Sequence, residues 1–251
     1  MVCLRGQWCA LALVAIGSAA FAQTPSVDDL VAKNLAAKGG ADALRALTSV
    51  KMTGRIKGPA GVEPVTSWAK RPNFRRRENV REGQTFVLGF DGKTVWGINP
   101  LMSARAREIT GPQAEMTRQD ADDFDSLLLD YKSKGRVIEL VGTEPVQGIA
   151  MHRLRVTGKN GQIQEVYLNA ETMLESKMVM QVEQGGRKGI VALEFSNYKT
   201  IDGITIPLHI RQTFNGQPMT EVTYDDVQFN VPMDDALFSM PVVKELEAPG
   251  S

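Results

Sequence analysis

Few residues of this sequence have the types and spacing that enzyme or metal chemistry requires. The two histidines, His152 and His209, each stand alone in a segment of β-strand composition, with no second ligand at metal spacing. Gly92-Lys93-Thr94 matches the end of a phosphate-binding loop, but that motif needs a glycine where this sequence has Val87. No Gly-x-Ser-x-Gly motif occurs. The sequence therefore predicts a protein that is not an enzyme and needs no cofactor or metal. A hydrolase assembled from distant residues ranks third, behind two binding functions.

Two clusters of charge lie near the middle of the chain. The acidic cluster lacks the glycine and terminal glutamate of a calcium loop, so we interpret it as the solvated face of a helix. The basic cluster alternates between the two faces of a strand, and Arg76 shares its face with Glu78, where it could meet a lipid headgroup or that carboxylate. The formal net charge of +0 gives no general attraction to nucleic acid. The acidic cluster is Asp120, Asp122, Asp123, Asp125 and Asp130, and the basic cluster is Lys70, Arg71, Arg75, Arg76, Arg77 and Arg81.

The N-terminus has the order of a secretory signal peptide. Arg5 precedes an apolar run over 8–16, and Ala20-Phe21-Ala22 forms a cleavage site before Gln23. The run is shorter than the about 20 residues that span a bilayer. We expect a signal peptide over 1–22, one domain over 23–241 and a loose tail over 242–251, in a periplasmic protein that is not an integral membrane protein. Both cysteines fall within 1–22, so the mature chain would have no thiol.

The segment 86–100 reads as a β-hairpin around which the chain is organised. Asp91-Gly92 between two apolar runs is a strong hairpin signal. With these as the two turn residues, Val87 faces Trp96 and Leu88 faces Val95, so both faces of the ribbon are apolar. We therefore expect a curved sheet over an apolar interior, with another element packed on the opposite face.

These residues also carry a family resemblance. Asp91 to Trp96, followed by Asn99-Pro100 and preceded by Lys70 to Phe74, resembles the signature of the periplasmic outer-membrane lipoprotein carrier family, LolA. The resemblance implies a mainly β fold with helices: an unclosed, curved antiparallel β-barrel covered by a helical lid, with a cavity that takes acyl chains.

Hydrophobic periodicity predicts the remaining elements. Ser26 caps an amphipathic helix that ends at Gly39-Gly40, and 41–47 forms a second short helix. Period-two patterns predict strands at 50–57, 65–70 and 74–80, and helical spacing over 110–131 predicts one or two lid helices. Beyond Gly135 the chain reads as a meander of hairpins. A two-residue turn at Asn160-Gly161 would pair Leu154 with Tyr167 and Val156 with Glu165. The inward row would then be Ala150, His152, Leu154, Val156, Ile163 and Tyr167. Leu237 and Phe238 are expected to plug one end of the sheet.

The apolar rows present more inward surface than the short helices can fill, which predicts a hydrophobic cavity. Methionines spread over the strands suit a surface that repacks around variable apolar ligands. The predicted lipid-binding residues are Met52, Val87, Trp96, Leu154, Val156, Met178 and Met180 from the strands, Phe124 and Leu128 from the lid, and Arg76.

The first functional hypothesis is a non-enzymatic periplasmic carrier or chaperone that binds acyl chains of a lipid or lipoprotein. It would act as a monomer and could exchange cargo with a membrane-bound donor or acceptor protein. The alternative is an envelope-stress regulatory module of the same fold that binds a protein partner.

Overall fold

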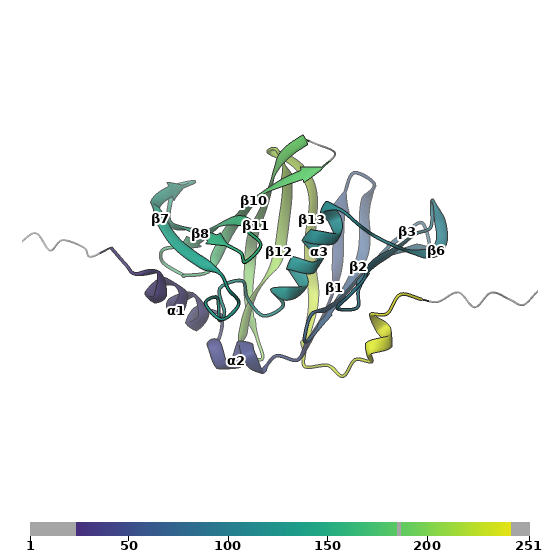
Figure 1. The fold of residues 1–251 in the computed structure, drawn as a ribbon, viewed down its shortest axis with the longest axis horizontal. Coiled ribbons are helices and arrows are strands. Elements are labelled where there is room, and N and C mark those ends of the chain that lie inside the picture. The colour runs from purple at the N-terminus through teal and green to yellow at the C-terminus, as the bar shows by residue number, and fades with distance from the viewer. Residues whose placement is uncertain (1–23, 185–186, 242–251) are drawn as a thin grey trace, which may run out of the picture.

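The computed structural model describes residues 24–184 and 187–241, and within them the strands form one antiparallel sheet (Figure 1). The strand order is β6-β5-β4-β3-β2-β1-β13-β12-β11-β10-β9-β8-β7, so β1 pairs with β13 and joins the two halves. In this described part, β6 and β7 are the edges and the sheet does not close into a barrel. The helices are α1 (Val27–Ala37), α2 (Ala41–Ala46), α3 (Pro112–Asp122) and the 3-10 helix η1 (Asp235–Leu237). The strands are β1 (Ser49–Gly58), β2 (Gly61–Lys70), β3 (Phe74–Arg81), β4 (Gln84–Phe90), β5 (Val95–Asn99), β6 (Ser103–Glu108), β7 (Val137–Val146), β8 (Ile149–Thr157), β9 (Ile163–Asn169), β10 (Glu175–Gln184), β11 (Arg187–Ile201), β12 (Ile204–Phe214) and β13 (Gln217–Phe229).

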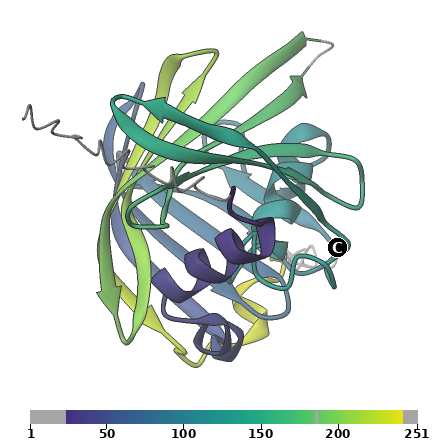
Figure 2. The ribbon, with the colours of Figure 1, turned by 90° about the vertical axis from the view of Figure 1, so that its left-hand side faces the viewer.

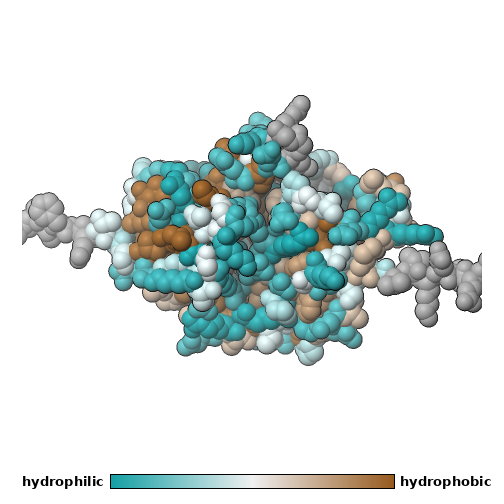
Figure 3. All heavy atoms as spheres, viewed as in Figure 1, coloured by the Kyte–Doolittle hydropathy of each residue, from teal (hydrophilic) through white to brown (hydrophobic). Residues whose placement is uncertain are grey.

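The sheet curves around its helices (Figure 2). We call the face covered by α1 and α3 the inner face, and the opposite one the outer face. This architecture confirms the predicted unclosed, curved, mainly β fold. Hydrophobic side chains gather on the β7 side of the molecule, whereas the surface over α3 is mainly hydrophilic (Figure 3).

The first two helices form as predicted. Ser26 caps α1 by accepting a hydrogen bond from Asp29 N, and the helix buries Leu30 and Leu35 on one stripe. Leu44 of α2 continues this stripe into a core shared with β7, β8 and β9. Burial of each such side chain contributes about 1.5–3 kcal/mol to folding. The two helices therefore close one end of the inner face.

The central hairpin has the predicted faces but not the predicted pairs. Asp91 Oδ1 accepts hydrogen bonds from Lys93 N at 2.9 Å and Thr94 N at 2.6 Å, which makes a four-residue loop in place of a two-residue turn. As a result Trp96 lies opposite Gly89, and Val87 lies opposite Ile98. The register moved by two residues, and because side chains alternate with period two, each one stays on its expected face.

The register of the β8–β9 hairpin differs from the predicted register by one residue, which turns the side chains of β9 to the opposite face. Its loop has five residues, closed by a hydrogen bond from Gly158 N to Gln162 O at 2.8 Å. Leu154 therefore pairs with Val166, and Val156 pairs with Gln164. A one-residue shift sends every side chain of β9 to the other face. The inner row holds Gln164, Val166 and Leu168. The predicted inward positions of Ile163 and Tyr167 are wrong, and Ala150 is exposed.

The predicted helical segment over 110–131 holds one helix, α3, which ends at Asp122. Beyond it, 123–136 is irregular and buries Leu127, Leu128 and Leu129 in succession. Three adjacent buried residues do not fit one face of a helix, which explains why helical spacing fails here. We call 123–136 the lid segment. Phe124 and Leu128 belong to it and not to a helix.

The last described segment, which contains η1, lies on the outer face of β3 and β5. Phe238 is fully buried, stacks on Phe74 with ring centroids 5.4 Å apart, and its carbonyl accepts a hydrogen bond from Trp96 Nε1 at 2.8 Å. This segment is the second layer that the two-faced hairpin requires. Phe238 is buried, but it covers the outer face of the sheet and does not plug one end as predicted. The proposed signal peptide and the loose tail over 242–251 lie outside the described residues.

Trp96 fits its site only because its cross-strand partner is glycine. A Cβ added at Gly89 would lie 2.3 Å from Trp96 Cε2. We expect Gly89→Ala to lower the free energy of unfolding by about 1–3 kcal/mol through overpacking. The measurement is the urea midpoint. Gly142→Ala is the matched control, because nothing lies within 4 Å of its added Cβ, and it should stay within about 0.5 kcal/mol of the parent protein. Equal midpoints for the two variants would contradict this packing.

Candidate functional site

The helix α3 crosses the inner face, close to β3, β4 and β5 on one side and to β10 on the other. Its buried residues Ala114 and Ala121 join Phe90 and Val95 in a small core. Short side chains bring the helix axis close to β4 and β5 and fill that side completely. On its other side α3 faces β9 and β10, and there two hollows remain.

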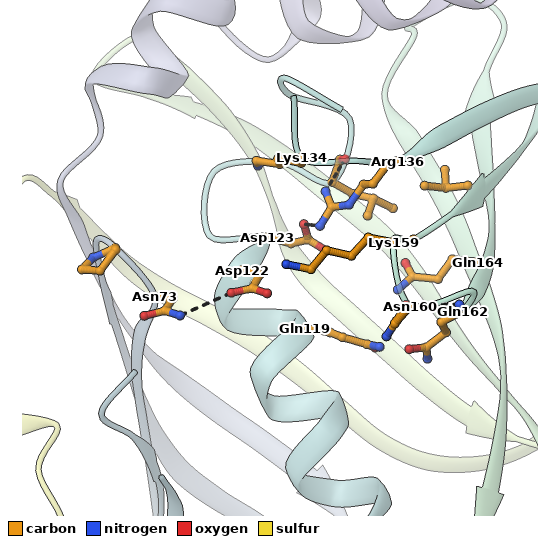
Figure 4. A pocket seen from close by; sticks show the side chains of 14 residues that line it. Asn73, Gln119, Asp122, Asp123, Lys134, Arg136, Lys159, Asn160, Gln162 and Gln164 are labelled. Atoms are coloured by element: carbon orange, nitrogen blue, oxygen red, sulfur yellow. Dashed lines mark hydrogen bonds and ion pairs between the residues drawn. The ribbon is translucent and has the colours of Figure 1, made fainter. Parts of the chain in front are cut away.

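The first hollow, which we call the amide pocket, lies at the C-terminal end of α3 (Figure 4). It has a volume of about 360 Å³ and is bounded by α3, the lid segment and the β8–β9 hairpin. Val156 and Leu127 supply apolar surface. Its polar lining comprises Asn73, Gln119, Asp122, Asp123, Lys134, Arg136, Lys159, Asn160, Gln162 and Gln164.

The second hollow, which we call the Met116 pocket, lies at the N-terminal end of α3 and has a volume of about 370 Å³. Gln162 lines both hollows, so the two follow the same side of α3 along β9 and β10. Each falls within the range of about 300–1,000 Å³ that small-molecule sites occupy. The Met116 pocket is lined by Gly111, Pro112, Glu115, Met116, Gln162, Gln181, Val182 and Glu183.

Ion pairs brace the lid segment internally, through Lys134 and Arg136, and tie it to its surroundings through Arg71. Asp125 binds Arg71 at 2.8 Å and Lys134 at 2.9 Å, and Asp123 pairs with Arg136. The same Arg71 side chain donates to Leu47 O of the α2–β1 connection at 2.5 Å. We call these contacts the latch. It joins the lid segment to α2 and to the β2–β3 turn.

The latch corrects the interpretation of the two charge clusters. Asp120 and Asp122 are exposed on α3, as a solvated helix face requires. The side chain of Asp125, however, is only 5% exposed, and that of Asp123 is 18% exposed. Arg71, the partner of Asp125, and Arg75, which pairs with Asp120, both belong to the basic cluster, so the two clusters partly neutralise each other across the fold.

Burial and pairing act in opposite directions on the latch carboxylates. Burial pushes the pKa of Asp125 upward, but hydrogen bonds from Lys134 and Arg71 outweigh it and hold the pKa below its ordinary value. For Asp123, burial outweighs the opposing charge and hydrogen bond of Arg136, and the pKa is raised. Of the two carboxylates, Asp125 is therefore the one whose charged form the fold stabilises.

The structure divides the predicted lipid-binding residues between the two faces. Those on the inner side are Met52, Phe124, Leu128, Leu154, Val156, Met178 and Met180, and those on the outer face are Arg76, Val87 and Trp96. Leu128 and Leu154 are 0% exposed within the packed core. Among the ten, Val156 borders one of the two pockets. The ten residues therefore do not line a single cavity.

The three outer-face residues lie with the C-terminal segment. Arg76 pairs with Glu78 at 2.6 Å, as the sequence suggested, and donates to Leu237 O at 2.7 Å. Its guanidinium also lies 5.3 Å from the ring centroid of Trp96. These contacts fasten the C-terminal segment and leave Arg76 on the opposite face of the sheet from the pockets.

Sequence reasoning missed the residues that line the pockets. Gln162 and Gln164 were assigned no inward position because the β8–β9 loop was taken as a two-residue turn. A signal was available in Gly158, which together with Gly161 permits a longer loop. In residues 24–184 and 187–241 no group of three or more histidine, cysteine, aspartate or glutamate side chains is placed to hold a metal ion.

Comparisons with known proteins find similar folds but no matching sequence family. No protein-family model matches the chain, and no curated protein matches it. Similar solved structures include a DUF1329 family protein from Desulfovibrio piger, with 17% identity and a TM-score of 0.58 over 86% of this chain and 98% of that one. A putative outer membrane lipoprotein-sorting protein domain from Vibrio parahaemolyticus has 16% identity and a TM-score of 0.53, covering 83% and 94% of the two chains. A LolA superfamily protein from Nitrosomonas europaea has 15% identity and a TM-score of 0.54, covering 82% and 96%. The chain therefore has a LolA-like fold, which confirms the resemblance at the level of structure.

No helix of the described residues is both long enough and apolar enough to cross a bilayer.

The latch yields a stability prediction with a defined pH dependence. Asp125→Asn removes one charge from a buried network, and we expect it to lower the free energy of unfolding by about 1–3 kcal/mol at neutral pH. Because the folded pKa of Asp125 is lowered, its contribution is complete above about pH 5 and is lost as the pH falls through that folded value. Urea titrations at several pH values measure this difference.

Asp42→Asn is the control for this experiment. Asp42 also pairs with an arginine, Arg45, but its side chain is fully exposed, so its loss should change stability by less than about 0.5 kcal/mol. A difference between the Asp125 variant and the parent protein that stayed constant into strong acid would contradict the latch.

Proposed function

We propose that this protein binds the acyl chain of a lipid or lipoprotein between α3 and the inner face of β9 and β10, and carries it without covalent chemistry. The LolA-like fold supports this proposal, and one of the similar structures is described as a putative outer membrane lipoprotein-sorting protein domain. The sequence features of a signal peptide over 1–22 fit a carrier that works in the periplasm.

The observation that carries the proposal is the pair of hollows that α3 leaves beside β9 and β10. Alanines fix the helix to β4 and β5, while the side that faces β9 and β10 keeps two hollows of about 360 and 370 Å³. A hollow whose lining lacks contacts forfeits dispersion energy, and a guest restores it. An acyl chain gains about 0.8 kcal/mol for each methylene that it buries, so about ten methylenes would contribute several kcal/mol.

The latch links cargo binding to movement of the lid segment. Water can replace its ion pairs and hydrogen bonds when the segment lifts. The segment also buries Leu127, Leu128 and Leu129, and exposing them would cost about 25 cal/mol per Å², which buried cargo would have to offset. Cargo that enters beside α3 would shift the equilibrium toward the lifted state, and its release would restore the latch. A membrane-bound donor or acceptor could act on the same equilibrium.

A substitution that fills the Met116 pocket tests the proposal. We expect Met116→Trp to weaken binding of a fluorescent long-chain fatty acid roughly tenfold or more, because the larger ring occupies the space that the chain needs. The measurement is a fluorescence titration of the delipidated protein. Thermal melting of the variant should remain close to that of the parent protein, since the ring enters an existing hollow.

Met102→Trp is the matched control, because Met102 is 76% exposed at the β5–β6 turn. It should leave fatty-acid affinity unchanged. If the unmodified protein binds no fatty acid, and native mass spectrometry of the exported protein shows one stoichiometric protein partner and no lipid, the carrier proposal is wrong.

A further inference from the structure

The amide pocket has a lining unlike the apolar core beside it. Five carboxamide side chains surround it, from the β2–β3 turn, α3 and the β8–β9 hairpin (Figure 4). A carboxamide both donates and accepts hydrogen bonds, so such a lining fits a ligand that presents both kinds of group. The five residues are Asn73, Gln119, Asn160, Gln162 and Gln164.

In one of these five residues the carboxamide oxygen lacks a hydrogen-bond donor. Gln164 lies on the inner face between Val156 and Met180, and its Oε1 is buried with no hydrogen-bond partner in the described chain. A buried acceptor without a donor is costly, and native proteins seldom keep one without a reason. A solvated surface amide would not have this burial. The position therefore favours a ligand that brings an N–H or O–H group.

Two opposite charges around the pocket have no ion-pair partner in the part of the chain that the structure describes. Arg136 pairs with Asp123, and Lys134 with Asp125, so these charges are already matched. Lys159 makes no such pair, and it extends from the hairpin across the pocket toward Asp122 (Figure 4).

The carboxylate of Asp122 likewise has no ion-pair partner among the described residues. Its one hydrogen bond comes from Asn73 Nδ2, at 3.4 Å. A cation and a carboxylate thus remain available on facing walls of the pocket.

We propose that the amide pocket holds a phosphate headgroup that carries hydrogen-bond donors, either an ammonium or hydroxyls, with the phosphate toward Lys159 and the donors toward Asp122 and Gln164. This inference rests on the proposed function and names the ligand class of the same site. The first methylenes would contact Val156 and Leu127, and the chain would continue past Gln162 to the Met116 pocket.

Two lipids that differ only in donors test the proposal. Dioctanoyl phosphatidylethanolamine and dioctanoyl phosphatidylcholine have the same chains and charges, but the choline nitrogen has no N–H. We expect the ethanolamine lipid to displace a fluorescent fatty acid from the delipidated full-length protein at roughly fivefold lower concentration. Dioctanoyl phosphatidylglycerol, with hydroxyl donors, should behave like the ethanolamine lipid. Equal displacement by the ethanolamine and choline lipids would overturn the headgroup assignment and leave the carrier proposal standing.

Matched variants identify the groups responsible. Gln164→Leu should reduce the preference for ethanolamine over choline to less than about twofold. Gln217→Leu, at an exposed position at the start of β13 that lines neither pocket, should retain it. Lys159→Met should weaken both phospholipids to a similar extent and keep the preference, because it removes the contact to phosphate that they share.

A preference that survives Gln164→Leu would overturn the assignment of the donor site. Failure of the unmodified protein to bind the fatty acid at all would instead overturn the proposed function, and the headgroup assignment with it.

Discussion

The buried charged contact of Asp125 with Arg71 and Lys134, together with the burial of Leu127, Leu128 and Leu129, positions the lid segment above the inner face. Through it the lid segment is tied to α2 and to the β2–β3 turn, and α3 is held across the sheet at its C-terminal end. The helix itself contributes little apolar anchoring, because the side chains that it buries are alanine and threonine. The lid segment also buries Leu127, Leu128 and Leu129 in the core, so its movement has an apolar cost as well as an ionic one. The short side chains of α3 leave space beside the helix. The lid segment therefore both carries the latch and lines the amide pocket.

The outer face has a separate role. There Trp96, Phe74 and Phe238 form a dry contact that joins the C-terminal segment to β3 and β5, with Arg76 fastening the backbone. This contact stabilises the sheet far from α3. Movement of the lid segment need not disturb it, so stability and binding can depend on different faces of the same strands.

The faces of the central hairpin could be predicted because they depend on alternation, which survives a register shift of two residues. The LolA-like resemblance rests on the motif around Asp91 to Trp96, which does not depend on register. The inner row of β9 could not be predicted, because loop length decides it, and a register shift of one residue turns Gln164, Val166 and Leu168 inward in place of Ile163 and Tyr167. The end of α3 was missed for a related reason. The leucines after Asp122 are buried by tertiary contacts from several directions, and no period describes them. The amide pocket is lined by residues from three segments that are distant in sequence, and a single sequence does not show that they lie close together in the fold.

The central claim is that an acyl chain lies along α3 between the two pockets, and photo-crosslinking tests it most directly. A fatty acid with a diazirine in mid-chain would be bound to the delipidated protein, irradiated, and the modified peptides identified by mass spectrometry. The account predicts labels on the peptides that contain Met116 and Val182, which line the Met116 pocket. Labels confined to the outer face around Trp96, or spread evenly over the protein, would contradict it.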